Sequence, residues 1–179
     1  LVGSGFWKVY ESIGGDLTKD KEFINKLLDK VNLGIVSSDE LHTAAAHRLG
    51  MSKKEWKTIL HDDEKPNEKV FSFIKKSLKG RYKIGLLSNV GPGVLERKIP
   101  PKFFILFDKI IVSSEIKLIK PDPEIFKYAC SQLHVNPKNA IFIDDQETFL
   151  KGAEKIGMKT MLYTNLEDLK NKLKRLLNV

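Results

Sequence analysis

The sequence has very little cysteine and no long apolar run. Cys130 is the single cysteine among 179 residues, so an internal disulfide is excluded, and with it a disulfide-stapled secreted scaffold. No stretch of about 18 apolar residues occurs, and no basic segment leads into an apolar stretch near Leu1, so the sequence predicts neither a membrane span nor a signal peptide. We therefore expect a cytoplasmic protein with no membrane partner.

Arginine is also scarce. The net charge of +8 comes mainly from lysines spread along the chain, and there are only four arginines, namely Arg48, Arg81, Arg97 and Arg175. Surfaces that bind nucleic acid usually cluster their arginines, so we expect no nucleic-acid partner. The positive charge suits small anionic ligands such as phosphorylated metabolites. The sequence indicates no particular oligomeric state.

What the chain does contain is enough apolar material for one compact core. Hydrophobic residues make up 41% of the sequence, and 10 of them are phenylalanines. A chain of this length buries roughly 70% of its unfolded surface when it folds, so the composition excludes overall disorder. We expect one domain, or one domain with a modest insertion.

Residues 1–80 have a helical pattern throughout. Asp20 precedes an apolar face of helical spacing and is predicted to cap that helix. Two capping-box patterns follow, Ser37 with Glu40 and Ser52 with Glu55. We interpret residues 1–80 as a small helical cap together with a linking helix.

Residues 81–179 alternate short apolar runs with helical segments, which is typical of βα units around a parallel sheet. The predicted strands are 84–87, 109–112, 140–143 and 159–163. The predicted fold class is therefore α/β, with a Rossmann-like parallel core in residues 81–179.

Three of these four runs are followed by side chains suited to binding or catalysis. Ser88 and Asn89 follow the first run, Lys120 stands in the loop after the second, and Asp144 and Asp145 follow the third. Ligands of open parallel sheets bind at the carboxyl ends of the strands, so we expect these side chains to converge. Mg²⁺ prefers hard oxygen ligands and is often held by one or two carboxylates plus a phosphate, while a hydroxyl and an ammonium group bind the remaining phosphate charge. The pattern predicts a site for phosphate and a divalent cation.

Three stretches of the chain resemble the haloacid dehalogenase-like superfamily of hydrolases, most of which are phosphatases. They are 83–89, 120–126 and 141–145, which are similar to the second, third and fourth motifs of that family. The nearest branch has small helical caps and includes sugar-phosphate phosphatases and the phosphatase domain of bifunctional epoxide hydrolases. The resemblance implies a Rossmann-like core with a helical cap inserted after its first strand.

The resemblance also implies roles for the polar residues. Ser88 and Asn89 are expected to bind the phosphoryl group, and Lys120 is expected to neutralise the phosphate and the nucleophile. Asp145 is expected to bind Mg²⁺ directly, and Asp144 directly or through water. The substrate is then a small phosphorylated metabolite.

The family's first motif, an Asp-x-Asp at the end of the first strand, does not occur in this sequence. That motif supplies the nucleophile and the general acid/base, and its strand lies between the strands that precede Ser88 and Asp144. Since Leu1 is not a methionine, and residues 1–4 resemble those that follow the first motif, we expect the nucleophile to lie upstream of the chain given. The chain alone is then expected to be inactive.

Two other functions are open at this stage. The protein could be a relative without a nucleophile that binds phosphate in a regulatory role, or it could be a haloacid dehalogenase of the same superfamily, whose chemistry needs no metal.

A further departure from the family pattern is Phe149, which stands where this branch often has an asparagine that orders the metal site.

Overall fold

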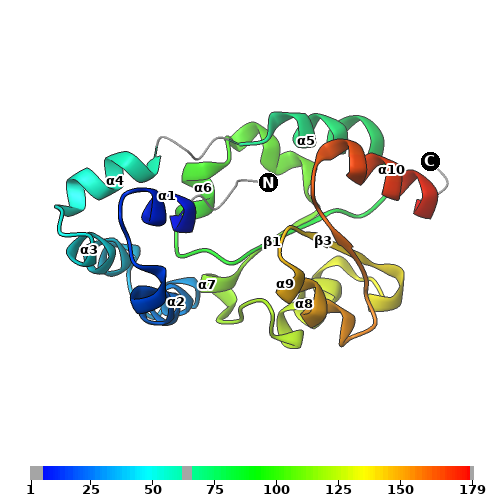
Figure 1. The fold of residues 1–179 in the computed structure, drawn as a ribbon. Coiled ribbons are helices and arrows are strands. Elements are labelled where there is room, and N and C mark those ends of the chain that lie inside the picture. The colour runs from blue at the N-terminus through cyan, green and yellow to red at the C-terminus, as the bar shows by residue number, and fades with distance from the viewer. Residues whose placement is uncertain (1–5, 62–65, 178–179) are drawn as a thin grey trace. The chain divides into compact units, whose positions relative to one another are not determined.

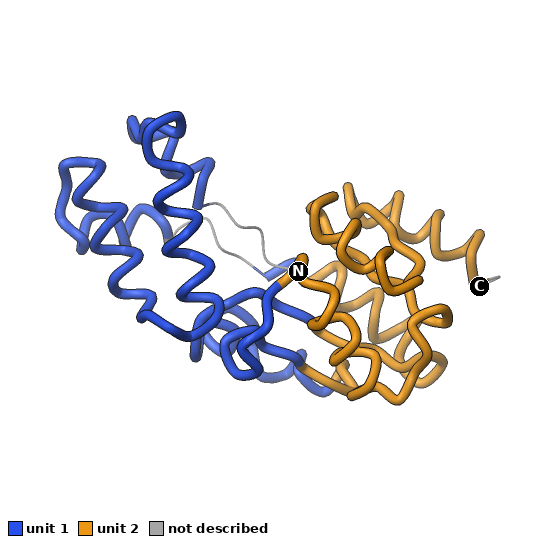
Figure 2. Tube along the Cα trace, turned by 90° about the horizontal axis from the view of Figure 1, so that it is seen from below, with its two compact units in different colours: residues 1–67, 87–105, 111–119 blue, residues 68–86, 106–110, 120–179 orange. Residues whose placement is uncertain are grey.

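The computed structural model describes residues 6–61 and 66–177, and these form two compact units. Unit 1 comprises residues 1–67, 87–105 and 111–119, and unit 2 comprises residues 68–86, 106–110 and 120–179 (Figure 2). Each unit combines segments from both sides of residue 80, and the division into a cap at 1–80 and a core at 81–179 stays a prediction. Residues 1–4, which resemble those that follow the first motif, lie outside the described residues.

The N-terminal part of unit 1 consists of four helices. They are α1 (Phe6–Ser12), α2 (Leu17–Asn32), α3 (Ser38–Arg48) and α4 (Lys53–His61). Their shared core contains a group of aromatic rings in edge-to-face and stacked contacts, in which Phe6, Tyr10 and Trp56 are buried. Burial of such large rings is the main stabilising term for a helical unit of this size.

The cap of α2 differs from the sequence prediction. Asp16 is the N-cap residue, and its side chain accepts hydrogen bonds from the backbone N–H groups of Thr18 and Lys19. Asp20, predicted as the cap, lies one turn inside the helix, where its carboxylate accepts a hydrogen bond from the Tyr10 hydroxyl at 2.7 Å. The prediction placed the start of the helix one turn too late, because both aspartates precede apolar residues.

Asp20 is buried but fully engaged. Arg48 forms an ion pair with its second oxygen, and the Arg48 guanidinium also lies 4.2 Å from the ring centroid of Phe23. The hydrogen bond from Tyr10 lowers the pKa of Asp20, and Arg48 lowers it further. The three polar groups thus satisfy one another and join α1, α2 and α3.

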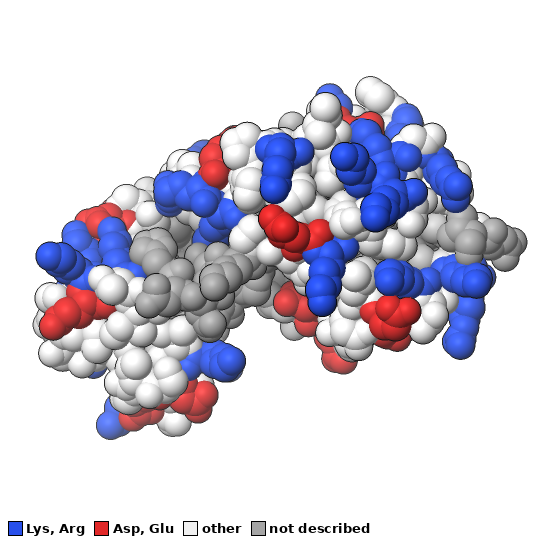
Figure 3. Space-filling view, turned by 90° about the horizontal axis from the view of Figure 1, so that it is seen from above, with Lys and Arg blue, Asp and Glu red and all other residues white. Residues whose placement is uncertain are grey.

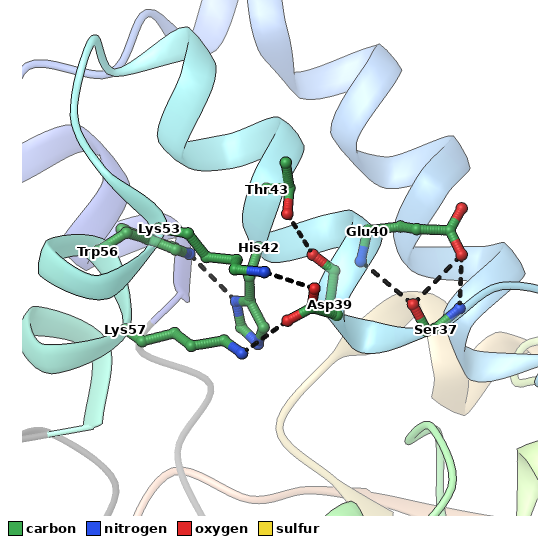
Figure 4. A network of polar contacts seen from close by, with 8 residues as sticks. All are labelled: Ser37, Asp39, Glu40, His42, Thr43, Lys53, Trp56 and Lys57. Atoms are coloured by element: carbon green, nitrogen blue, oxygen red, sulfur yellow. Dashed lines mark hydrogen bonds and ion pairs between the residues drawn. The ribbon is translucent and has the colours of Figure 1, made fainter.

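Both predicted capping boxes are present. Ser37 and Glu40 exchange hydrogen bonds at the start of α3, and Ser52 and Glu55 do the same at the start of α4. Between the two helices, Asp39 accepts hydrogen bonds from two lysines of α4, as Figure 4 shows. These lysines lower the pKa of Asp39 to about 2.

The rest of the chain follows an alternating pattern of strands and helices (Figure 1). The helices are α5 (Glu68–Phe73), a π-helical turn (Ile74–Leu78), α6 (Val94–Lys98), a 3-10 helix (Pro101–Leu106), α7 (Ser113–Ile116), α8 (Pro123–Leu133), a 3-10 turn (Pro137–Asn139), α9 (Glu147–Glu154) and α10 (Leu166–Leu177). The strands are β1 (Gly85–Ser88), β2 (Lys109–Val112), β3 (Ile141–Asp144) and β4 (Lys159–Leu162). All four predicted strands occur, with ends shifted by one residue or less.

The strands pair in two separate sheets. β1 pairs with β2, and β3 pairs with β4 in parallel with Asp144 opposite Leu162. Within the part of the chain that the structure describes, β1 and β3 therefore each have one hydrogen-bonded neighbour.

In unit 2, helices pack on the β3–β4 pair. Helix α9 contacts both strands, and Met161 of β4 packs with Leu169 and Leu173 of α10. Cys130 on α8 is buried, and burial raises the pKa of its thiol.

The charged side chains form no single basic surface on the face drawn in Figure 3. On that face, lysines and arginines are spread over the surface with acidic side chains among them. Within residues 6–61 and 66–177, no helix is both long and apolar enough to cross a bilayer.

Candidate functional site

A buried ion pair stands at the carboxyl end of β3. The Lys120 ammonium lies 2.6 Å from Oδ2 of Asp144, and the side chains are only 7% and 10% exposed. Asp144 ends the strand, while Lys120 comes from the loop that leads to Asp122, the N-cap of α8. Two groups that are 24 residues apart in the sequence thus meet at the strand end, as expected for a parallel sheet.

The position of Lys120 is set by tight packing around it. Helix α9 carries Gly152 against this loop, where a Cβ atom would clash with the Pro121 carbonyl oxygen and would lie 2.9 Å from a ring carbon of Phe126. The Phe126 ring packs edge-to-face on Phe142 of β3, with 4.9 Å between centroids. The close approach of α9 therefore needs glycine at position 152.

Two aromatic rings face the Lys120 ammonium. The ring centroid of Phe149 lies 4.6 Å from Nζ, and that of Phe142 lies 5.5 Å away. Cation–π contact stabilises an ammonium that has lost most of its water. Phe149 thus forms a cation–π contact with the ammonium of Lys120, which the comparison with the family's asparagine did not reveal.

The two carboxylates of the Asp144–Asp145 pair have different surroundings. Both oxygens of Asp144 accept hydrogen bonds, Oδ2 from Lys120 and Oδ1 from the backbone N–H of Gln146 at 3.0 Å. Desolvation raises the pKa of Asp145 although its side chain is exposed overall, and a hydrogen bond with Asp144 and the charge of Asp144 raise it further. A bound cation would offset the repulsion between these two carboxylates.

These residues fit a magnesium ion in type and in number. Mg²⁺ binds through one or two carboxylates and completes its octahedron with water and substrate phosphate oxygens. Within residues 6–61 and 66–177, no group of three or more histidine, cysteine or acidic side chains is placed to hold a metal by itself. Asp144 and Asp145 could therefore provide part of a magnesium site but not a closed protein cage.

Ser88 and Asn89 belong to unit 1. Ser88 ends β1 and is half-buried, and Asn89 follows it. The next residue, Val90, donates its backbone N–H to the Ser113 hydroxyl at 3.0 Å. The structure thus brings Lys120, Asp144 and Asp145 together in unit 2, and it places Ser88 and Asn89 together in unit 1. Their convergence into one site, and the role of each residue, stay predictions.

Comparison with known protein families gives one match, to the haloacid dehalogenase-like hydrolases, over residues 37–163. This is more than half of the chain. The protein belongs to the haloacid dehalogenase-like hydrolase family. The prediction made from the three motifs is confirmed at this level.

Two of the similar relatives have names that describe different activities. The chain is 24% identical over 176 residues to D-ribitol-5-phosphate phosphatase of Bacteroides thetaiotaomicron, a match that covers 91% of this chain and 84% of that enzyme. It is 30% identical over 89 residues to (S)-2-haloacid dehalogenase 4A of Burkholderia cepacia, a match that covers 49% of this chain and 38% of that enzyme. The second match spans well under two thirds of its relative.

Solved structures support the family fold. A haloacid dehalogenase-like hydrolase from Porphyromonas gingivalis has a TM-score of 0.73 at 25% identity and matches 97% of this chain and 89% of its own. A family enzyme from Bacteroides thetaiotaomicron, in complex with magnesium and inorganic phosphate, has a TM-score of 0.69 at 24% identity and matches 94% of this chain and 93% of its own. The α/β class with a Rossmann-like core is therefore confirmed.

Proposed function

We propose that this chain is part of a Mg²⁺-dependent phosphatase that acts on a small phosphorylated metabolite. The observation that carries the proposal is the buried Lys120–Asp144 pair beside Asp145, at the carboxyl end of a parallel strand. An ammonium group and two carboxylates at such an edge suit a phosphate held with a divalent cation. The similarity to a ribitol-phosphate phosphatase and to a family enzyme crystallised with magnesium and phosphate supports the same reading.

In this proposal the chain's residues bind and orient the phosphoryl group. Lys120 neutralises charge on the phosphate and on the nucleophile, while Ser88 and Asn89 donate hydrogen bonds to phosphate oxygens. Asp145, with Asp144, holds Mg²⁺, which when bound offsets the negative charge of the transferring group.

The nucleophile is proposed to come from a segment upstream of Leu1. An aspartate carboxylate there would attack phosphorus and release the substrate's alcohol, and water would then hydrolyse the aspartyl-phosphate. The separate β1–β2 and β3–β4 sheets support this proposal, because among the described residues β1 and β3 each pair with only one strand.

The test compares the chain given with the product of the full reading frame, including any codons before Leu1. With Mg²⁺ and a panel of phosphomonoesters, the longer protein should release phosphate and the 179-residue chain should not. Lys120→Met in the longer protein should abolish turnover, whereas Lys127→Met should not, because Lys127 pairs with Glu124 on the surface. Failure of the longer protein on every phosphomonoester would refute the proposal.

Two alternatives have distinct signatures. The lack of any Asp-x-Asp in this chain favours a phosphate-binding relative without turnover if none is encoded upstream. The similarity to a haloacid dehalogenase favours carbon–halogen hydrolysis, which would release halide from a 2-haloacid equally well after chelation of Mg²⁺.

A further inference from the structure

The hydroxyl of Ser113 joins three segments of unit 1 that are far apart in the sequence. Ser113 is fully buried at the point where β2 ends and α7 begins. Its Oγ accepts the backbone N–H of Val90 at 3.0 Å and donates to the backbone carbonyl of Asn32 at 2.6 Å, with the Val90 carbonyl as a longer second acceptor at 3.3 Å. One side chain thus connects the last residue of α2 with the loop after β1.

Close packing strengthens the same connection. A Cβ atom on Gly91 would lie 2.9 Å from Cγ1 of Val31, so this loop approaches α2 more closely than any larger residue permits. On the other side of the helix end, Lys117 donates to the carbonyl of Gly34 at 3.2 Å. The C-terminal end of α2 is therefore fixed to the loops that follow both β1 and β2.

We propose that Ser113 is a positioning residue that holds Ser88 and Asn89 in a phosphate-binding conformation and couples them to helix α2. The peptide group between Asn89 and Val90 is planar, so a fixed Val90 N–H also fixes the Asn89 carbonyl and limits the rotation of Asn89. The functional part of this inference rests on the proposed binding of phosphate by Ser88 and Asn89.

The neighbouring serine offers a matched control. Ser114 is 3% exposed, and its hydroxyl has no hydrogen-bond partner among the residues that the structure describes. Ser113→Ala and Ser114→Ala each remove one buried hydroxyl from adjacent positions of the same short helix. Only the first leaves the Val90 N–H without its acceptor, so a difference between the two variants reports the hydrogen bonds of Ser113.

The first measurement is amide hydrogen exchange by NMR in the 179-residue chain. The Val90 amide should exchange about tenfold faster or more in Ser113→Ala than in the wild type, and at the wild-type rate in Ser114→Ala. Ser113→Thr, which keeps the hydroxyl, should restore slow exchange. If Ser113→Ala does not fold, Ser113→Cys takes its place, since a thiol of similar size is a weaker partner and should give an intermediate rate.

The second measurement is a titration with inorganic phosphate in the presence of Mg²⁺, followed through the amide signals of Ser88 and Asn89. Ser113→Ala should weaken phosphate binding about fivefold or more relative to Ser114→Ala, and Ser113→Thr should recover it. Equal Val90 exchange in the two alanine variants, or equal phosphate affinity, would overturn the inference. If the wild-type chain binds no phosphate, the functional part of the inference fails, while the proposed function is decided by the turnover of the longer protein. The exchange rates still decide whether Ser113 holds the loop.

Discussion

Replacing Lys120 by methionine tests the candidate site through stability alone, without any assumption about substrate. The variant keeps an unbranched apolar stem and removes the ammonium that lies 2.6 Å from Asp144. Breaking a buried ion pair from one side typically costs about 3–5 kcal/mol, because the remaining charge stays buried without its partner. Gln146 still donates to the other Asp144 oxygen, so we expect a loss near the lower end, about 3 kcal/mol.

A double-mutant cycle separates the pair from its surroundings. Asp144→Asn alone should also destabilise the protein, since it leaves Lys120 buried without its carboxylate. The double variant should be clearly more stable than the sum of the two single losses predicts, with a coupling of about 2 kcal/mol. Added Mg²⁺ should recover part of the Lys120→Met loss if the cation binds the carboxylates as proposed.

The choice of probe matters because both tryptophans, Trp7 and Trp56, lie in unit 1. Tryptophan fluorescence therefore reports on that unit, and urea unfolding of unit 2 is better followed by far-UV circular dichroism or by amide exchange in β3. Lys127→Met is the control, because it removes an exposed ion pair worth about 0.5 kcal/mol at most. A Lys120→Met loss no larger than that of the control, or additive losses in the cycle, would refute the energetic argument.

Three further predictions concern unit 1. Tyr10→Phe removes the hydrogen bond to buried Asp20 and should lower the free energy of unfolding by about 1–2 kcal/mol in tryptophan-monitored urea titrations. Because that bond lowers the pKa of Asp20 in the folded state, its contribution to stability is present above pH ~4 and is lost as the pH falls through the folded pKa. Tyr10→Phe should therefore lose less stability on acidification than the wild type does. Parallel curves of unfolding free energy against pH would contradict this. Gly91→Ala should lower the free energy of unfolding by about 1–3 kcal/mol through its clash with Val31. The double variant Gly91→Ala/Val31→Ala should lose less stability than the sum of the two single losses, because the smaller side chain at position 31 relieves the clash. Strictly additive losses in thermal melts would count against the clash. Asp39, whose pKa is lowered to about 2, should lose its stabilising effect between pH ~4 and 2, so Asp39→Asn should flatten the curve of stability against pH in that range. At pH 7 and high salt, where the ion pairs are screened, the variant and the wild type should have the same stability.

The strands were predictable because their signal is local. Apolar runs of four or five residues, each followed by polar residues, fixed all four strands to within a residue. The two capping boxes were also local patterns and occur as predicted. Asp20 was misassigned because the capping signal is degenerate where two aspartates stand four residues apart, and only the tertiary contact with Tyr10 distinguishes a cap from a buried ion.

The partners of the site residues could not be read from the sequence. Phe149 faces Lys120 across 29 positions of the chain, and Ser113 bonds to Asn32 across 81. Neither contact produces a periodic or compositional pattern in the sequence, because a single serine or phenylalanine can be buried against many different partners. The placement of Ser88, Lys120 and Asp144 at or after the ends of three successive strands carried the functional signal, whereas the residues that hold them in place gave none.

The contacts of the two adjacent carboxylates suggest how they divide the work of the proposed site. Both oxygens of Asp144 are already occupied, one by an ammonium and one by a backbone N–H. Direct coordination of a cation by Asp144 would compete with Lys120, and two positive charges so close together would repel each other. Within the part of the chain that the structure describes, Asp145 forms no ion pair with a lysine, so we expect it to be the better direct ligand. Asp144 is then better placed to hold Lys120 toward the phosphate and to reach the cation through water. On this reasoning Asp145→Asn should weaken Mg²⁺ binding more than Asp144→Asn does in calorimetric titrations. Asp144→Asn should lower the free energy of unfolding more than Asp145→Asn does in urea melts. The reverse order would show that the Lys120–Asp144 ion pair opens when the metal binds.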